Sequence, residues 1–203
     1  MESISPEVWQ TLLSIGLGIA LAAATGFRVF VPFLVMGIAV NAGYMELAPG
    51  WAWIGETPAL YILGTATFLE IVAYFIPWLD NVLDTIATPA AVVAGIVIAA
   101  SVITGMSPAL TWTLAAIAGG GAALAVQGVT VLARSLSSVV TFGIGNFSVS
   151  LGELVSSILL SVVAVFVPIA ALVLLILFGV WVWRRYGRAI RDRMPKPYDP
   201  LAV

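Results

Sequence analysis

The sequence predicts an all-α integral membrane protein, a compact bundle of about six to seven transmembrane or re-entrant helices plus a short interfacial amphipathic helix. Hydrophobic residues make up 62% of the 203 residues and charged residues 9%, whereas soluble domains are about 25% charged. The mean hydropathy is +1.13, and several apolar stretches are long enough to cross a bilayer. We expect one polytopic membrane domain over residues 1–183 and a basic tail over residues 184–203.

Two missing residue types narrow the chemistry. The chain contains no cysteine and no histidine, which excludes disulfides, thiol chemistry and the usual zinc sites. Any bound metal would therefore need oxygen ligands. The N-terminal sequence MESISPEVWQ has no basic region, so we do not interpret it as a cleaved signal peptide.

The first apolar stretch, Val8–Asn41, is too long for one crossing and is interrupted at Thr25-Gly26 and at Arg28. It predicts two segments, one ending near Ala24 and one over about Phe27–Val40. The first segment carries a stripe of small residues that would let a neighbouring helix approach closely, namely Ser14, Gly18 and Ala22.

The next part of the chain combines an interfacial loop with a third crossing. Trp51 and Trp53 follow a Pro-Gly turn, a pattern typical of the membrane interface. The stretch Pro58–Ile76 is long enough to span and contains Glu70.

Leu79 to Thr88 predicts a short amphipathic helix. Its apolar residues fall on one stripe, and the opposite stripe is polar, consisting of Asp80, Asn81, Asp84, Thr85 and Thr88. Ten residues rise only about 15 Å, so this helix should lie at an interface or enter a protein-lined cavity. We expect Thr88-Pro89 to end it and to start the next helix, with Thr88 as the N-cap.

The C-terminal half predicts four further crossings. Ala90–Ile103 forms the fourth and Ala109–Leu136 the fifth. Three consecutive glycines are expected to weaken the helix of the fifth crossing. Polar residues recur along one of its faces, namely Gln127, Thr130 and Arg134. Phe147–Val182 would reach roughly 50 Å as one helix, so we divide it at Pro168.

The basic residues predict the orientation. Six of the eight follow the last segment, namely Arg184, Arg185, Arg188, Arg191, Arg193 and Lys196, so the tail should be cytoplasmic. Seven crossings then put the N-terminus outside, and bring the Arg28 break, Asp80, Asp84, Arg134 and Glu153 to the cytoplasmic side. The breaks near Gly26 and Pro168 could instead belong to re-entrant half-helices, which would change the number of crossings.

Three blocks of sequence resemble a bacterial membrane family known only as domain of unknown function 4126. The blocks are GFRVFVPFLVMGIA, LEIVAYFIPWLDNVLDTIATP and GNFSVSLGELVSSILL. Gly26, Arg28 and Pro32 match the first, and the middle block keeps Glu70, Asp80, Asp84 and Thr88. Tyr74 and Phe75 stand where the family usually has a charged pair. The resemblance implies a multi-pass protein of the cell inner membrane. It implies no particular activity, because the function of the family is unknown.

Each acidic residue has a structural and a functional interpretation. Glu70, inside a predicted crossing, either serves function or bonds to Arg28 or Arg134. Asp80 and Asp84, one turn apart, either share a cation or simply lie on the water-exposed face of an interfacial helix. Ser150 and Glu153 have the spacing of a capping box. They also begin a polar stripe that continues through Ser157 and Ser161, and Asn146 precedes it.

A charge count connects these residues. Away from the outer loop, Val8–Val182 contains Arg28 and Arg134 against four acids, Glu70, Asp80, Asp84 and Glu153. Since unmatched charge is costly in an apolar medium, we expect protonated carboxylates, a bound cation or open water. We also expect the six residues to converge on one site.

Three function classes remain open. A small transporter or channel for a cation or proton fits the polar stripes and the acidic excess. A metal-dependent enzyme acting on lipid phosphate would use Asp80 and Asp84 as metal ligands, but no known catalytic motif is present. A membrane scaffold would use the tail to bind anionic lipid or protein. A homo-oligomer is compatible with all three, and no nucleic-acid partner is expected.

Overall fold

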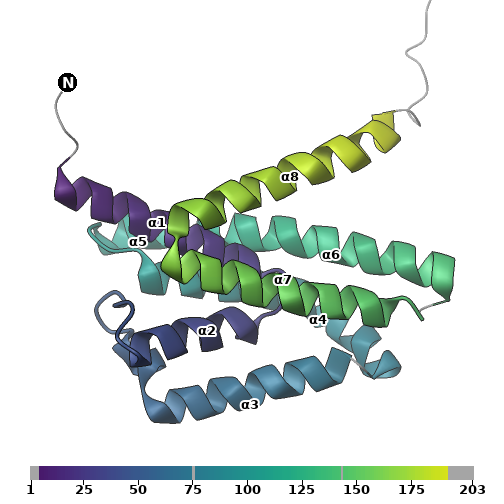
Figure 1. Ribbon diagram of the computed structural model, residues 1–203, viewed down its shortest axis with the longest axis horizontal. Helices are drawn as coiled ribbons and strands as arrows, with labels where there is room; N and C mark the ends of the chain where they lie inside the picture. Colours follow the sequence, from purple (N-terminus) through teal and green to yellow (C-terminus); the bar gives the residue numbers. More distant parts are fainter. Residues whose placement is uncertain (1–4, 75, 143, 192–203) are drawn as a thin grey trace, which may run out of the picture.

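The computed structural model describes residues 5–74, 76–142 and 144–191, without the side chains of residues 77–85 and 186–191. These ranges contain α-helices, one 3₁₀ turn and one π-helical turn and no strand, which confirms the all-α class. The elements are α1 (Pro6–Thr25), α2 (Phe30–Asn41), η1 (Ala52–Gly55), α3 (Thr57–Tyr74), α4 (Pro77–Val102), α5 (Pro108–Leu114), η2 (Ala115–Gly119), α6 (Gly120–Thr141), α7 (Asn146–Phe166) and α8 (Pro168–Arg191) (Figure 1).

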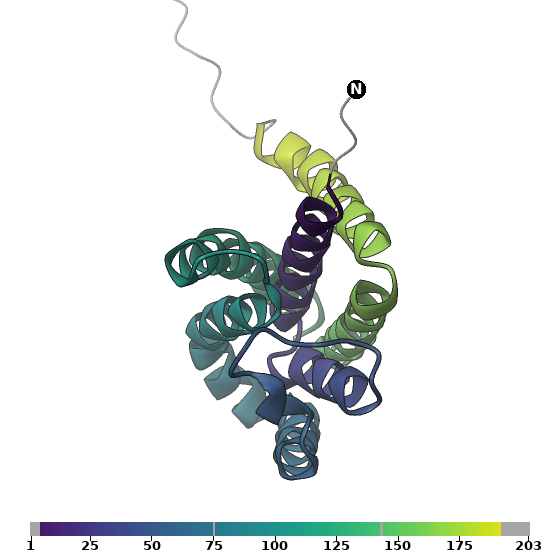
Figure 2. The same ribbon diagram turned by 90° about the vertical axis from the view of Figure 1, so that its left-hand side faces the viewer.

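The helices run back and forth along one long axis. The C-terminal ends of α3, α6 and α8 and the starts of α4 and α7 lie at one end of the bundle (Figure 1). The start of α1 and the links α2–α3, α4–α5 and α7–α8 lie at the other. Seen end-on, α1 lies inside the bundle (Figure 2), where it contacts α4, α6, α7 and α8.

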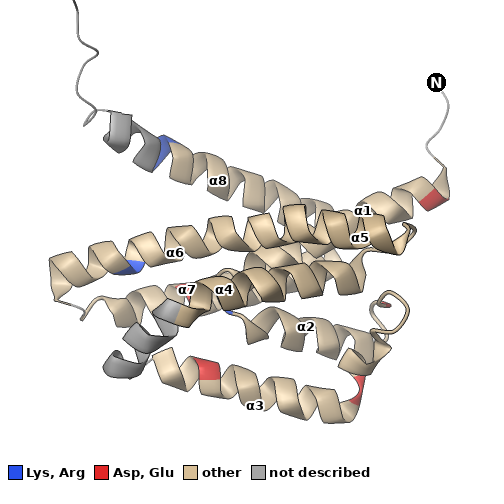
Figure 3. Ribbon diagram, turned by 180° about the vertical axis from the view of Figure 1, so that it is seen from behind, with Lys and Arg blue, Asp and Glu red and all other residues tan. Residues whose placement is uncertain are grey.

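The length and composition of the helices indicate a multi-pass membrane protein. Among the residues whose side chains the structure describes, five helical stretches are long and apolar enough to span, namely α1, α3, the continuous stretch Pro108–Thr141, α7 and residues 168–185 of α8. The described ribbon carries few charges (Figure 3). Large apolar side chains such as Tyr61, Phe68 and Ile176 are exposed on its outside. A surface this apolar is expected to face a lipid bilayer.

The predicted small-residue stripe of α1 packs on α4. A Cβ at Gly18 would lie 3.4 Å from the Cα of Ala99, so the two backbones are close. One turn away, the Ser14 hydroxyl accepts a hydrogen bond of 3.1 Å from the Thr104 N–H at the end of α4. The expected close approach of a neighbouring helix is confirmed.

Gly26 fixes the break between α1 and α2 against α6. A Cβ at this position would lie 2.5 Å from the Ala123 carbonyl oxygen, so no side chain fits without a shift of the backbone. The chain turns here, and α2 starts at Phe30. Arg28, between the two helices, is only 2% exposed. The break is therefore buried in the bundle.

The predicted boundary at Thr88-Pro89 is wrong. A single helix, α4, runs over 26 residues with Pro89 in its interior. The expected interfacial helix and the fourth crossing are thus one element. Proline removes one backbone N–H, and neighbouring helices and local adjustment can accommodate this loss in a membrane bundle.

The other two predicted irregularities occur where they were expected. The triple glycine begins at the π-helical turn η2, where a Cβ at Gly119 would lie 2.8 Å from the Gly95 carbonyl oxygen of α4. The long C-terminal stretch divides at Pro168 into α7 and α8. Both halves are long enough to span, so Pro168 marks a turn between two candidate crossings.

Candidate functional site

Two buried arginines meet one buried glutamate between α6 and α7. Arg134 of α6 donates from Nε to Glu153 Oε1 at 2.9 Å, and its Nη2 pairs with Glu153 Oε2. Arg28 Nη2 lies 3.4 Å from the same Oε2. All three side chains are at most 5% exposed. A shared carboxylate lowers the cost of burying two guanidinium groups, but it balances only one of their charges.

The Arg28 side chain also binds the backbone of α7. Its Nη2 donates to the Ser150 carbonyl oxygen at 2.9 Å, which ties the α1–α2 break to the second turn of α7. Within the described part of the chain, Nε and Nη1 of Arg28 and the hydroxyl of Ser150 have no hydrogen-bond partner. Buried polar atoms are normally satisfied by protein or water, so these groups can bind a small polar species.

Tyr74 lies against both arginines. The Arg28 guanidinium carbon is 3.8 Å from the centre of the tyrosine ring, and that of Arg134 is 4.4 Å from it. Such cation–π contacts stabilise desolvated guanidinium groups. Through Tyr74, the last residue of α3, this helix becomes part of the same cluster.

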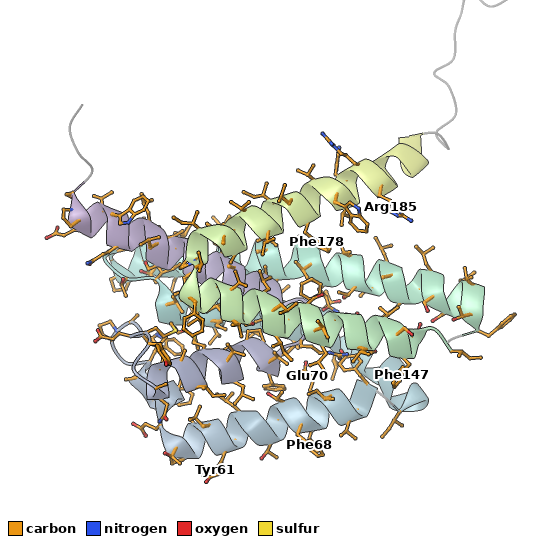
Figure 4. The ribbon with its side chains drawn as sticks, in the orientation of Figure 1. Tyr61, Phe68, Glu70, Phe147, Phe178 and Arg185 are labelled. Atoms are coloured by element: carbon orange, nitrogen blue, oxygen red, sulfur yellow. The ribbon has the colours of Figure 1, made fainter. Side chains whose placement is uncertain are left out.

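Glu70 holds the start of α2. Its Oε1 accepts a hydrogen bond from the Val29 N–H at 2.6 Å, and its Oε2 accepts one from the Phe30 N–H at 3.1 Å. A carboxylate at this position satisfies the first backbone donors of the helix and complements its dipole. Figure 4 shows Glu70 on the side of α3 that faces α2. Neither sequence-based interpretation of Glu70 included this role.

The capping-box interpretation of Ser150 and Glu153 is wrong. The N-cap residue of α7 is Gly145, and Ser150 lies inside the helix. Glu153 instead binds the arginines. The cause is the earlier start of α7, which leaves Ser150 with no free helix terminus to cap.

The polar stripe of α7 faces the interior. Ser150, Glu153, Ser157 and Ser161 are all buried. The Ser157 hydroxyl donates to the Ala24 carbonyl oxygen at 3.0 Å, close to the break after α1. The Ser161 hydroxyl has no partner among the described residues.

The remaining polar residues lie along α6 and its turn into α7. Gln127 and Thr130 are buried on the same helix as Arg134. At the end of α6, the Asn146 amide donates to the Ser138 hydroxyl at 3.0 Å. The polar face of α6 expected at Gln127, Thr130 and Arg134 is thus buried. Beyond Arg134, the hydrogen bond between Ser138 and Asn146 connects α6 with the start of α7.

Asp80, Asn81 and Asp84 belong to the first turns of α4, and their side chains lie outside the described residues. Thr88, one turn later, is half-buried. No group of three potential metal ligands occurs among the side chains that the structure describes. The metal site predicted at Asp80 and Asp84 therefore stays a prediction. The role of the polar and charged candidate residues as a ligand or ion pathway also stays a prediction.

A family model described as "Domain of unknown function (DUF4126)" matches residues 15–187. The chain belongs to this family. No curated protein and no solved structure matches it. The matched region of this DUF4126 protein contains every residue of the cluster.

Two contacts of the DUF4126 chain were not predicted from its sequence. The first is the Glu70 cap, whose partner lies 41 positions away. The second is the position of Tyr74 against both arginines. The sequence did contain a hint of the Tyr74 contact, because Tyr74 stands where the family resemblance leads one to expect one member of a charged pair.

Proposed function

We propose that the protein is a small transporter that moves a proton or a cation through the polar cluster of Arg28, Glu70, Arg134 and Glu153. The observation that carries this proposal is the buried arginine at the break between α1 and α2. Ionisable residues inside membrane bundles are rare and mark ion or substrate pathways. Broken helices near the bilayer midplane form the binding sites of many secondary transporters.

The length of α2 supports a re-entrant hairpin. Its 12 residues rise about 18 Å, less than the roughly 30 Å of a hydrocarbon core. The start of α1 and the end of α2 lie at the same end of the bundle (Figure 1). In our proposal the chain enters along α1, turns at Arg28 inside the membrane, and leaves along α2 on the side from which it entered.

The balance of charges favours a positive species. In the described part of the cluster, Arg28 and Arg134 are matched by Glu70 and Glu153. Asp80 and Asp84 occupy the fourth and eighth positions of α4, which starts at the bundle end where α3 and α6 finish (Figure 1). They supply the acidic excess, so a cation or proton entering here would be stabilised, whereas an anion would be repelled.

The buried hydroxyls of α7 give such a species polar contacts beyond the cluster. Ser150 and Ser161 each retain an unsatisfied hydroxyl within the described chain, and they lie three turns apart on one face. We propose that this face lines the route. The tail, residues 184–203, is cytoplasmic in a bacterial inner membrane, so the cluster opens toward the cytoplasm.

Flux measurements in liposomes test the proposal. The purified protein is reconstituted in liposomes that contain a fluorescent indicator for the ion tested, and gradients of H⁺, Na⁺, K⁺ or Mg²⁺ are imposed one at a time. The double variant Asp80→Asn, Asp84→Asn should lose flux by about tenfold or more, equivalent to about 1.4 kcal/mol, while it keeps the parent's melting temperature. Glu56→Gln, an acid-to-amide change at an exposed position, should transport normally. Parent liposomes that match protein-free liposomes for all four ions would refute the proposal.

A further inference from the structure

The carbonyl groups at the end of α1 are already hydrogen-bonded. Where a membrane helix is broken, freed backbone carbonyls and helix C-termini often coordinate Na⁺ or another cation. Here the Ala22 oxygen accepts the Thr25 hydroxyl at 2.7 Å, and the Ala23 oxygen accepts the Gly26 N–H at 3.1 Å. The Ala24 oxygen accepts two N–H groups of the following turn and a serine hydroxyl of α7. The break therefore lacks the exposed carbonyls that hold a metal ion in such folds.

The carboxylates of the cluster are occupied as well. Both oxygens of Glu153 bind guanidinium groups, and both oxygens of Glu70 accept backbone N–H groups at the start of α2. A metal ion needs several oxygen ligands at once. To gain them here it would have to displace these hydrogen bonds and lie beside two guanidinium charges, which repel it.

The groups that remain free are suited to hydrogen bonding. Within the described part of the chain, Nε and Nη1 of Arg28 and the hydroxyl of Ser150 have no partner. Arg28 is 2% exposed and Ser150 1% exposed, and the 2.9 Å bond from Arg28 Nη2 to the Ser150 carbonyl oxygen makes them neighbours. Guanidinium nitrogens only donate, whereas a hydroxyl donates and accepts. A water molecule satisfies both, because its oxygen accepts from Arg28 while it exchanges a hydrogen bond with Ser150.

We infer that the species crossing the cluster is a proton, carried through water held between Arg28 and Ser150, and not a metal ion. This inference rests on the proposed transport function and names its substrate. In each transfer, a water or hydroxyl oxygen accepts one proton and releases one of its own to the next oxygen. One O–H bond forms and another breaks, so no ligand shell has to be built.

The buried face of α7 extends the route. The Ser157 and Ser161 hydroxyls follow Ser150 on this face, and that of Ser161 also has no partner among the described residues. From Ser150 to Ser161 the helix rises by about 16 Å, about half of a hydrocarbon core. Hydroxyls at this spacing, connected by water, form a chain of donors and acceptors along which a proton can move.

The charges around Arg28 are balanced before a proton arrives. The charged and titratable side chains that interact with Arg28 come from three helices, namely Glu70 and Tyr74 of α3, Arg134 of α6 and Glu153 of α7. Two carboxylates thus oppose two guanidinium groups. Asp80 and Asp84, whose side chains lie outside the described residues, belong to the first turns of α4. In our proposal they attract the proton to this end of the bundle.

Ion selectivity in liposomes tests the inference on the full chain. In one experiment a pH gradient is imposed, with K⁺ and valinomycin on both sides to hold the voltage at zero, and an internal pH indicator reports H⁺ entry. In the others, gradients of Na⁺, K⁺ or Mg²⁺ are imposed with a protonophore present, and an indicator for each metal ion reports its entry. The parent should carry H⁺ faster than protein-free liposomes and carry none of the three metal ions.

The outcomes separate this inference from the transport proposal. Entry of any of the three metal ions above the protein-free level overturns the assignment of the proton and leaves transport standing. Absence of flux for all four ions overturns both.

Removing the free hydroxyl tests the part played by Ser150. Because this hydroxyl has no described partner to lose, Ser150→Ala should melt no lower than the parent. Its H⁺ flux should fall by about tenfold or more, since a positioned proton carrier is lost. Ser156→Ala is the matched control, because Ser156 lies on the same helix and lines an apolar hollow beside α8; it should transport H⁺ like the parent. Unchanged flux in Ser150→Ala, or an equal loss in Ser156→Ala, would overturn the relay through Ser150.

Discussion

Replacing Glu153 with glutamine should destabilise the protein strongly. The carboxylate is the shared partner of Arg28 and Arg134, and it is 4% exposed. A glutamine amide fits the same space, but it carries no charge and offers one acceptor where the carboxylate offers two. Its NH₂ group would also face a guanidinium donor. Both arginines would then remain buried without their common counter-charge.

The expected magnitude follows from this burial. Removing one partner of a buried ion pair costs about 3–5 kcal/mol. For a chain of this length, each kcal/mol lowers the melting temperature by about 2–4 °C, so we expect a fall on the order of 10 °C. Replacing Arg134 as well removes one of the two unmatched charges. The double variant Arg134→Gln, Glu153→Gln should therefore be at least as stable as Glu153→Gln alone.

Thermal unfolding in detergent, followed by circular dichroism and by aggregation, measures these effects. The control is Glu56→Gln, whose exposed side chain should leave the melting temperature within about 2 °C of the parent. If Glu153→Gln melts with the parent, or if the effects of the Arg134 and Glu153 substitutions simply add, the three side chains do not stabilise one another as described.

Three further predictions concern the surroundings of the cluster and the orientation of the chain. Glu70→Gln should lower stability by about 1–2 kcal/mol, because the start of α2 loses a charged acceptor for two N–H groups; the same unfolding assay measures it, and an unchanged melt would contradict the capping role. Tyr74→Leu should be less stable than Tyr74→Phe by about 1–2 kcal/mol, because only phenylalanine retains the ring against both guanidinium groups; equal stability of the two variants would exclude a cation–π contribution. A reporter fused after Val203 should be active only in its cytoplasmic form, since the basic tail sets the orientation; periplasmic activity would reverse the proposed sidedness of the whole cluster.

Much of the helical framework could be predicted from local sequence. The length of the last apolar stretch required a break, and Pro168 was the residue able to make it. Gly18 and Ser14 indicated a close helix contact, because small residues in a membrane helix have few other uses. Pro89 misled the prediction, since a proline that starts a helix and one that is accommodated inside it have the same local sequence.

Part of the candidate site could also be anticipated. The cost of an isolated buried charge predicted that Arg28 and Arg134 would lie near an acid, and both contact Glu153. Which acid they contact depends on how α6 and α7 pack, and this is not encoded near any of the three residues. The Glu70 cap on α2 is likewise a tertiary contact, because its partners are backbone N–H groups that look alike in every sequence.

Cysteine accessibility tests transport along the polar face of α7 most directly, because the chain has no native cysteine. Ser150→Cys, close in size to the parent residue, would be probed in liposomes with a membrane-impermeant thiol reagent. Leu159→Cys, exposed on the apolar surface, is the lipid-facing control. Transport predicts that Ser150→Cys reacts from the side of the C-terminal tail, that the transported ion slows this reaction, and that Leu159→Cys stays unmodified. If Ser150→Cys is as unreactive as Leu159→Cys from both sides and under every ion gradient, water and ions do not reach the cluster.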